Sequence, residues 1–310
     1  MVADTGMVLS IGECMVELSP AADGLYRRGF AGDTFNTAWY LRRLLPSEVD
    51  VAYFTNVGDD PLSQEMVSFI AGSGVSTRHI RPMAGRVAGL YLISLNGHER
   101  SFSYWRDTAA AKALADDEDR LREAVASARV VYFSGITLAI LPEERRAAFL
   151  RIMAQARQNG TLVAFDPNIR DRLWQGRAAC AQGIEAGAEV ASICLPSFDD
   201  EARIFGDDTP QTIALRYLAL GCDEVVVKDG GGDALLMLRG ETQGQVVAAT
   251  KVAKPVDTTG AGDSFGAGYI AARLTGRAPL EAVSHGHATA AKVIQGYGGL
   301  VDTSAIAELA

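Results

Sequence analysis

Short apolar runs rich in β-branched residues recur along the middle of this chain and alternate with longer stretches of helical periodicity. The runs span residues 130–133, 162–165, 190–195 and 224–227, and a helical pattern over Glu143–Gln158 separates the first two. Continuous apolar runs of this length are typical of strands buried on both faces of a parallel sheet that is covered by helices. The sequence therefore predicts an α/β fold with a mainly parallel central sheet.

The first 60 residues begin the same alternation. Residues 7–11 and 14–18 have the pattern of two extended segments, a helical pattern starts after Asp33 and ends at Pro46, and residues 51–57 have the pattern of another strand. The chain has 310 residues, and no linker rich in proline or serine divides it. We therefore expect one large domain with a small appendage.

The composition limits the classes of partner. Hydrophobic residues make up 48% of the chain and charged residues 22%, which is ordinary for a globular protein. The formal charge of −9 argues against nucleic acid or an anionic membrane as the main partner. The apolar run at residues 7–11 is too short for a signal peptide or a membrane span, so we expect a cytoplasmic protein. The cysteines form no C-x-x-C pair and are expected to be buried, reduced thiols; they are Cys14, Cys180, Cys194 and Cys222.

The segment 86–106 breaks the alternation, because two extended runs meet at Asn96-Gly97, a strong signal for a tight hairpin turn. With these two residues as the loop, Tyr91 would face Phe102. Side chains on strands alternate between faces, so Tyr91, Tyr104 and Arg106 are expected on one side of this ribbon, where they could grip a small anion. The alternative is that the aromatic rings only fill a half-buried sheet and that Arg106 is solvated.

The segment Asp257-Thr-Thr-Gly-Ala-Gly-Asp263 precedes an alanine-rich helical pattern. Its glycines lie where a helix begins and where the first amide groups are unpaired, which is a ready site for a phosphate. The positive end of the helix dipole is expected to keep the Asp263 carboxylate ionised. A carboxylate beside a phosphate site indicates phosphoryl transfer, whereas the alternative is a capped helix with glycines needed only for packing.

This run resembles the C-terminal signature of the ribokinase-like, or PfkB, carbohydrate kinases, D-T-x-G-A-G-D. The resemblance implies a three-layer α/β/α sandwich: a single kinase domain over residues 1–310, with a small β-sheet lid formed by residues 13–31 and 86–106. It also implies an ATP- and Mg²⁺-dependent sugar kinase in which Asp263 is the base. The backbone amides that would hold the transferring phosphate belong to Gly260, Ala261 and Gly262.

Several segments are similar to one branch of that family, the kinases of 2-keto-3-deoxygluconate. The matching segments are Ile11-Gly-Glu-Cys-Met-Val-Glu-Leu-Ser19, Gly32-Asp-Thr-Phe-Asn-Thr37, Tyr104-Trp-Arg106, Ala109-Ala-Ala-Lys112, Ser134-Gly-Ile136, Leu138-Ala-Ile-Leu141 and Phe165-Asp-Pro-Asn-Ile-Arg170. The substrate-binding residues that this resemblance implies are Gly32, Asp33, Asn36, Tyr91, Tyr104, Trp105, Arg106, Arg170 and Asp263.

A sugar acid gives a chemical reason for the arginines, because its carboxylate calls for a charge-assisted, preferably bidentate, partner. Arg106 is the first candidate. Arg170 would bind either the carboxylate or the γ-phosphate, or would pair with Asp166 or Asp171 at the surface. Asp33 replaces a glycine of the general family pattern, and it either accepts a substrate hydroxyl or caps the helix that follows.

The nucleotide site is expected from the same resemblance. The turn Lys228-Asp-Gly-Gly-Gly-Asp233 is similar to the turn that lies beside ATP in this family, although three glycines could also be only a hairpin. The ATP-binding residues that we expect are Asn168, Arg170, Ser197, Lys228, Gly230, Gly231, Gly232, Asp233, Gly260, Ala261 and Gly262. Asp200 keeps the acid of the motif that organises magnesium through water, with Asp199 and Glu201 as alternatives.

The sequence thus predicts transfer of a phosphoryl group from ATP to the C6 hydroxyl of 2-keto-3-deoxygluconate. The alternatives are another sugar kinase of the family, acting on fructose, ribose or a nucleoside, and a catalytically silent sugar-acid sensor. His285 and His287 are two residues apart on a predicted helix and are expected to be structural. Homo-oligomerisation through the edge of the lid is a further expectation.

Overall fold

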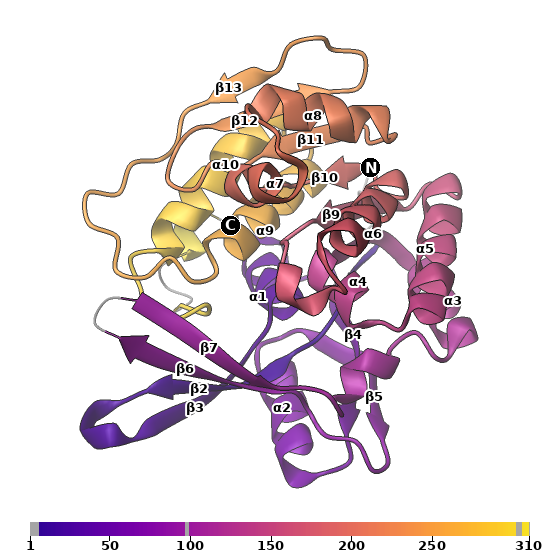
Figure 1. The fold of residues 1–310 in the computed structure, drawn as a ribbon, viewed down its shortest axis with the longest axis vertical. Helices are drawn as coiled ribbons and strands as arrows, with labels where there is room; N and C mark the ends of the chain where they lie inside the picture. Colours follow the sequence, from indigo (N-terminus) through magenta and orange to yellow (C-terminus); the bar gives the residue numbers. More distant parts are fainter. Residues whose placement is uncertain (1–5, 97–98, 302–305, 310) are drawn as a thin grey trace.

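The computed structural model describes residues 6–96, 99–301 and 306–309. Its body is a large sheet between two layers of helices, and a smaller sheet projects from one side (Figure 1). Predictions that concern residues 97 and 98 lie outside the described residues. None of the helices in the described ranges is long and apolar enough to cross a membrane.

The central sheet contains nine strands in the order β13-β12-β11-β10-β9-β8-β1-β4-β5. The strands from β11 to β5 in this order pair in parallel, and β12 and β13 add an antiparallel edge. The strand bounds are β1 Met7–Ile11, β4 Val51–Gly58, β5 Ser76–Met83, β8 Ala128–Ser134, β9 Leu162–Asp166, β10 Ile193–Cys194, β11 Glu224–Val227, β12 Ala234–Leu238 and β13 Gln245–Val247.

Each face of this sheet carries its own apolar core, because successive side chains of a strand point to opposite faces. In β1, Leu9 and Ile11 join one core and Val8 joins the other. The helices over the first core are α3 Glu118–Ala126, α4 Gly135–Ile140, α5 Glu143–Gln158, α6 Arg177–Glu189, α7 Phe198–Phe205 and α8 Pro210–Ala219. Those over the second are α1 Asp33–Leu44, α2 Pro61–Gly72, α9 Ala261–Leu274 and α10 Pro279–Val293. The predicted three-layer α/β/α sandwich is confirmed.

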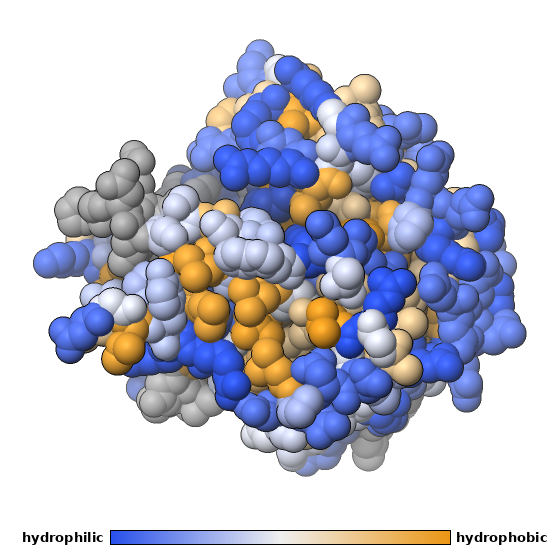
Figure 2. All heavy atoms as spheres, turned by 60° about the horizontal axis from the view of Figure 1, so that its bottom comes forward, coloured by the Kyte–Doolittle hydropathy of each residue, from blue (hydrophilic) through white to orange (hydrophobic). Residues whose placement is uncertain are grey.

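The smaller sheet has the order β3-β2-β6-β7 and draws its strands from two distant parts of the chain. Their bounds are β2 Met15–Pro20, β3 Tyr26–Ala31, β6 Leu90–Asn96 and β7 Glu99–Trp105. One face packs on the body, where the rings of Phe30 and Phe69 lie 5.5 Å apart. Figure 2 shows apolar surface where this sheet and α2 come forward. Exposed apolar side chains of these elements and their flanking turn include Leu25, Tyr26 and Trp105.

Short 3₁₀ helices complete the described secondary structure. The 3₁₀ helices are η1 Ala22–Gly24, η2 Ala110–Ala113, η3 Asp171–Leu173 and η5 Ala307–Leu309. All four cysteines are buried and free. His285 of α10 lies between the carbonyl oxygens of Gly268 and Leu309, at 2.9 Å from each, and His287 packs edge-on against Phe265.

Two details of the predicted strands are wrong. The apolar run 190–195 is not one strand, because Val190 caps the end of α6 and only Ile193–Cys194 pairs in the sheet. A short apolar run alone does not distinguish the buried end of a helix from a buried strand. In the hairpin, Tyr91 pairs with Tyr104 rather than with Phe102. The register differs by two residues, which equals the period of a strand, so the predicted faces of these side chains do not change.

Candidate active site

The first turn of α9 is preceded by a position that only glycine fits. Gly260 precedes the helix with a φ of 75°, and a Cβ atom there would lie 2.7 Å from the carbonyl oxygen of Gly299. The amide of Ala261 donates to the carbonyl oxygen of Thr258 at 3.2 Å. In the described part of the chain, the amides of Gly260 and Gly262 have no acceptor. Of the three amides expected to hold an anion, these two are therefore the better placed.

Asp263 lies in the same turn and faces the start of α1. Its Oδ2 accepts a hydrogen bond of 2.8 Å from Asn36 Nδ2, and its backbone carbonyl oxygen accepts one of 3.3 Å from the Thr37 hydroxyl. Burial, followed by the neighbouring Asp33 carboxylate, raises the pKa of Asp263 to about 7, although the Asn36 hydrogen bond opposes this. The helix dipole alone predicted a firmly ionised carboxylate. Desolvation outweighs it and leaves a group that titrates near neutral pH.

A chain of polar contacts leads away from α1 across the carboxyl edge of the sheet. Asp33 Oδ2 accepts a hydrogen bond from the side-chain Nδ2 of Asn168 at 2.8 Å, and the backbone N–H of Asn168 donates to Asp166 Oδ1 at 3.0 Å. Asp166 Oδ2 in turn accepts from Lys228 Nζ at 2.7 Å. The cap position of α1 is Gly32, and Asp33 is the first helical residue. The carboxylate of Asp33 divides its oxygens: Oδ1 accepts from the backbone N–H of Thr34 at 2.8 Å, and Oδ2 accepts from Asn168.

The Lys228 side chain brings a buried positive charge beneath the α9 turn. Lys228 is 8% exposed, and its Nζ lies 3.6 Å from the position that a Cβ atom of Gly262 would occupy. Burial raises the pKa of Asp166, while the attraction of Lys228 opposes the rise. The backbone of Lys228 also pairs with that of Ser197, which caps α7. An anion bound at the α9 turn would therefore meet both amides and an ammonium group.

The glycine turn after Lys228 is a hairpin between β11 and β12, which pair antiparallel. Its residues 229–231 and 233 are exposed, residue 232 is half-buried, and Gly230 has a φ of 50°. Asp233 accepts a hydrogen bond from the amide of Ala249 at 3.0 Å. The hairpin interpretation of this turn is thus correct, and its role in binding ATP stays a prediction.

On the smaller sheet, the expected aromatic and cationic side chains lie together. The rings of Tyr91 and Tyr104 are 6.0 Å apart, and the guanidinium of Arg106 lies 5.8 Å from the centre of the Tyr104 ring. The Tyr91 hydroxyl donates to Glu17. Trp105 belongs to the other face of the sheet and is 59% exposed, so the structure does not bring it together with the tyrosines.

Arg106 is not solvated, because it forms an ion pair with Glu13 at the base of the smaller sheet. The two side chains are 12% and 2% exposed. Burial raises the pKa of Glu13, and the neighbouring Arg106 opposes the rise. Glu13 was not among the expected site residues. A single acid inside the apolar segment 7–16 was the available signal, since a buried carboxylate calls for a partner.

Arg170 lies further out than Arg106. Its side chain is 51% exposed, and its Nη1 atom is 3.7 Å from Asp200 Oδ2. Within the described chain, neither Asp166 nor Asp171 forms an ion pair with it. Asp200 also accepts from Arg203 at 2.7 Å, so the expected magnesium-organising acid is held by two arginines.

The carboxylates of α7 do not form a complete metal site. Glu201 is fully buried, with hydrogen bonds of 2.7 Å from Arg216 and 2.8 Å from the Tyr217 hydroxyl, and burial raises its pKa to about 7. Asp199 is exposed. Among the described residues, no group of three His, Cys, Asp or Glu side chains could hold a metal ion. The donors present fit a magnesium ion that is held mainly by phosphate oxygens and water.

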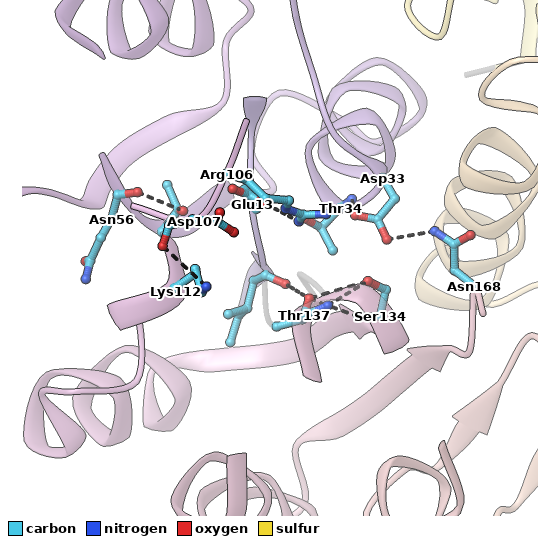
Figure 3. Close-up of polar contacts among 12 residues, drawn as sticks. Glu13, Asp33, Thr34, Asn56, Arg106, Asp107, Lys112, Ser134, Thr137 and Asn168 are labelled. Atoms are coloured by element: carbon cyan, nitrogen blue, oxygen red, sulfur yellow. Dashed lines mark hydrogen bonds and ion pairs between the residues drawn. The ribbon is translucent and has the colours of Figure 1, made fainter. Parts of the chain in front are cut away.

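Figure 3 shows how the polar groups of the site are distributed. Asp33 and Asn168 lie at one end, Arg106 and Glu13 lie in the middle, and Lys112 lies at the other end. A backbone anion site, a carboxylate near neutrality and a separate cationic region are the parts that phosphoryl transfer to an anionic acceptor requires.

The sequence pattern of the pfkB family carbohydrate kinases matches residues 5–305. The chain belongs to this family. It is 38% identical to the 2-dehydro-3-deoxygluconokinase of Dickeya dadantii, over 97% of this chain and 99% of the relative. It is 40% identical to the 2-dehydro-3-deoxygluconokinase of Escherichia coli K12, over 96% of this chain and 97% of the relative. Both names refer to the compound called 2-keto-3-deoxygluconate above.

The fold is that of other pfkB kinases. A fructokinase with bound ATP from Xylella fastidiosa superposes with a TM-score of 0.83 and 20% identity, covering 96% of this chain and 94% of the fructokinase. At this identity the likeness shows the fold. In a pfkB kinase, the residues at the start of α9 are candidates for the chemistry, and those at the base of the smaller sheet are candidates for substrate binding.

Proposed function

We propose that this chain transfers the γ-phosphoryl group of ATP to the C6 hydroxyl of 2-keto-3-deoxygluconate, giving the 6-phosphate. The observation that carries the proposal is the pairing of two sites. Asp263 and the amides of α9 lie at one, and the buried cation Arg106 lies at the other. An acceptor with a hydroxyl at one end and a carboxylate at the other matches that arrangement. The identity of 38–40% with two 2-dehydro-3-deoxygluconokinases supports the same substrate.

The chemistry follows from the residues around α9. Asp263 takes the proton of the acceptor hydroxyl, and Asn36 holds its carboxylate in position. The amides of Gly260 and Gly262 stabilise the charge that develops on the transferring group, and Lys228 adds an ammonium beside them. Ala261 contributes to the same turn. Asp200 would hold, through water, a magnesium ion that accompanies ATP, and the ion would supply further neutralisation of the charge.

The sugar acid binds between this turn and the smaller sheet. Arg106 donates to its carboxylate, and Tyr91 and Tyr104 flank the chain of hydroxyl groups. Asp33, which Asn168 already holds, accepts a substrate hydroxyl. The remaining substrate residues that we propose are Gly32, Asn36 and Asp263. Closure of the smaller sheet as a lid would exclude water from the transfer.

ATP binds along the carboxyl edge of the central sheet, beside β9 and β11. The residues that we propose for it are Asn168, Arg170, Ser197, Lys228, Gly230, Gly231, Gly232, Asp233, Gly260, Ala261 and Gly262. The exposed Arg170 is directed to the γ-phosphate rather than to the sugar acid, because its present partner, Asp200, belongs to the expected magnesium site.

Self-association is a second part of the proposal. The strands β3 and β7 are open edges, and Leu25 and Trp105 leave apolar surface exposed beside them. A second copy of the chain would cover both features. A cytoplasmic location is likewise part of the proposal.

A substrate panel tests the proposed reaction. The measurement is ADP release with ATP, Mg²⁺ and, in turn, 2-keto-3-deoxygluconate, its galactonate epimer, fructose, ribose and adenosine. We expect kcat/KM for the keto-deoxy acid to exceed that for each neutral substrate by at least about 100-fold, the worth of one charge-assisted contact. Equal turnover of fructose would assign another substrate, and binding of the acid without any turnover would indicate a silent sensor.

A further inference from the structure

The charge of Arg106 is already balanced before any substrate binds. Its guanidinium and the Glu13 carboxylate form a buried pair, and both side chains are almost completely enclosed. The pair is also incompletely satisfied, since Glu13 Oε1 and Arg106 Nε have no hydrogen-bond partner in the described chain. A neutral pair can orient a carboxylate through its free N–H groups, but it adds no net charge to attract one.

Glu13 cannot easily move away from this position. A Cβ atom on Gly89 would lie 2.5 Å from Glu13 Oε1 and 3.4 Å from the Cβ of Arg106, so the backbone of the smaller sheet closes directly over the pair. Met15 packs at the same place, 3.0 Å from that Cβ position. Arg106 therefore keeps its acidic partner in the resting protein.

Lys112 is the next cation along this side of the site. It lies in η2, the turn that follows the smaller sheet, and its Nζ donates to the carbonyl oxygen of Asp107 at 3.3 Å (Figure 3). Lys112 forms no ion pair with any described residue, and its side chain is half-buried. Its charge also lowers the pKa of Glu13, which places it within electrostatic reach of the pair.

We propose that Lys112 supplies the uncompensated positive charge that selects a sugar acid over a neutral sugar. Arg106 and Glu13 together contribute no net charge, and Asp33 also acts on Glu13, so Lys112 is the cation of this region that pairs with no described acid. Arg106 fixes the orientation of the carboxylate and Lys112 provides the attraction. This inference rests on the proposed function, because it concerns the same sugar-acid substrate.

The opposite end of the site is rich in acids. The carboxylates of Asp33 and Asp166 both raise the pKa of Asp263, and Lys228 is the cation that opposes them. Three acids and one ammonium leave that end negative until the nucleotide and its metal arrive. A sugar acid therefore enters with its carboxylate toward Lys112 and its far hydroxyl toward Asp263, which is the orientation that transfer to C6 requires.

The test compares Lys112→Met with Lys112→Arg. The control is Lys292→Met, at a lysine of α10 that forms an ion pair with Glu308. In Lys112→Met, KM for 2-keto-3-deoxygluconate should rise about 10- to 100-fold, while kcat and KM for ATP stay within about twofold. Lys112→Arg should recover most of the affinity. KM of the wild-type protein should also rise with salt, and that of Lys112→Met should rise less.

The outcomes separate this inference from the proposed function. If the wild-type protein phosphorylates the keto-deoxy acid and Lys112→Met has an unchanged KM for it, the role of Lys112 is wrong and the function stands. A fall in kcat or a rise in KM for ATP would show that the substitution acts on the fold or the nucleotide, and would also overturn the inference. If the wild-type protein does not act on the acid at all, both are wrong.

Discussion

The start of α9 and the base of the smaller sheet are the two ends of one site, and they are built in different ways. The α9 end is one continuous segment, Gly260 to Asp263, in which backbone amides and a single carboxylate do the binding. The other end assembles Glu13 with Arg106 and Lys112, which come from two separate parts of the chain. The first can be recognised from a few adjacent residues, whereas the second exists only in the folded protein.

The two ends also differ in the environment of their buried ion pairs. Lys228–Asp166 and Arg106–Glu13 each join one cation to one acid. Asp33 and Asp263 lie near the first pair, whereas Lys112 and Asp33 both act on the second. The acids are therefore concentrated at α9, and the cation without an acidic partner, Lys112, lies beside the smaller sheet. The acidic end calls for a cation that accompanies ATP, and Lys112 favours an anionic acceptor.

The largest effect should follow from Asp263→Asn at the α9 end. The amide cannot take the proton of the acceptor hydroxyl, so we expect kcat to fall by about 10²–10⁴-fold. KM for the sugar acid should change little, because the carboxylate of the substrate binds at the other end. ADP release with saturating ATP measures both constants.

Asp119→Asn is the matched control, since it makes the same replacement at an exposed acid of α3. It should retain the wild-type kcat. If Asp263→Asn keeps the wild-type kcat as well, Asp263 is not the base, and the proposal that the chemistry takes place at the α9 end is wrong.

The next effect, on stability, should follow from Glu13→Ala at the smaller sheet. Removal of Glu13 leaves the guanidinium of Arg106 enclosed without a counter-charge, which typically costs about 3–5 kcal/mol of the free energy of unfolding. KM for the sugar acid should rise too, because Arg106 loses the partner that orients it. Urea denaturation and steady-state kinetics measure the two changes.

Glu65→Ala provides the comparison for that stability change. Glu65 pairs with Arg28 of the same sheet, but these side chains are 52% and 49% exposed, so the loss should be below about 1 kcal/mol. Equal losses for the two variants would mean that the Glu13–Arg106 pair is not a buried, coupled interaction.

The difference between the two ends also explains what the sequence could predict. The bounds of β11 and α5 and the position of the α9 turn follow from local patterns, and the structure has them there. The Glu13–Arg106 pair joins residues 93 positions apart, so no local pattern contains it. The hairpin register failed for a similar reason, because an Asn-Gly turn signal does not decide which residues the strands pair. The ionisation of Asp263 was misjudged because a local dipole was weighed without the burial that tertiary packing adds.

The smallest effect concerns the pH dependence of the α9 end. Asp263 must be ionised to act as a base, and burial raises its pKa to about 7. We therefore expect kcat/KM for the sugar acid to rise about tenfold per pH unit below pH 7 and to level off above it. The same pKa has the opposite consequence for stability. Because it is raised above the ordinary value of 3.8, the stability that this group contributes is present below about pH 4 and is lost as the pH rises through 7.

Glu201 is the control for this profile, because burial also raises its pKa to about 7 but Arg216 and Tyr217 enclose it away from α9. Glu201→Gln should leave the midpoint of the activity profile where it is. Asp263→Asn should instead remove the part of the fall in stability between about pH 4 and pH 7 that Asp263 contributes, so that this variant is the more stable protein at pH 8. A midpoint that moves with Glu201, or a stability profile that Asp263→Asn does not change, would assign the titration near pH 7 to a group outside the α9 end.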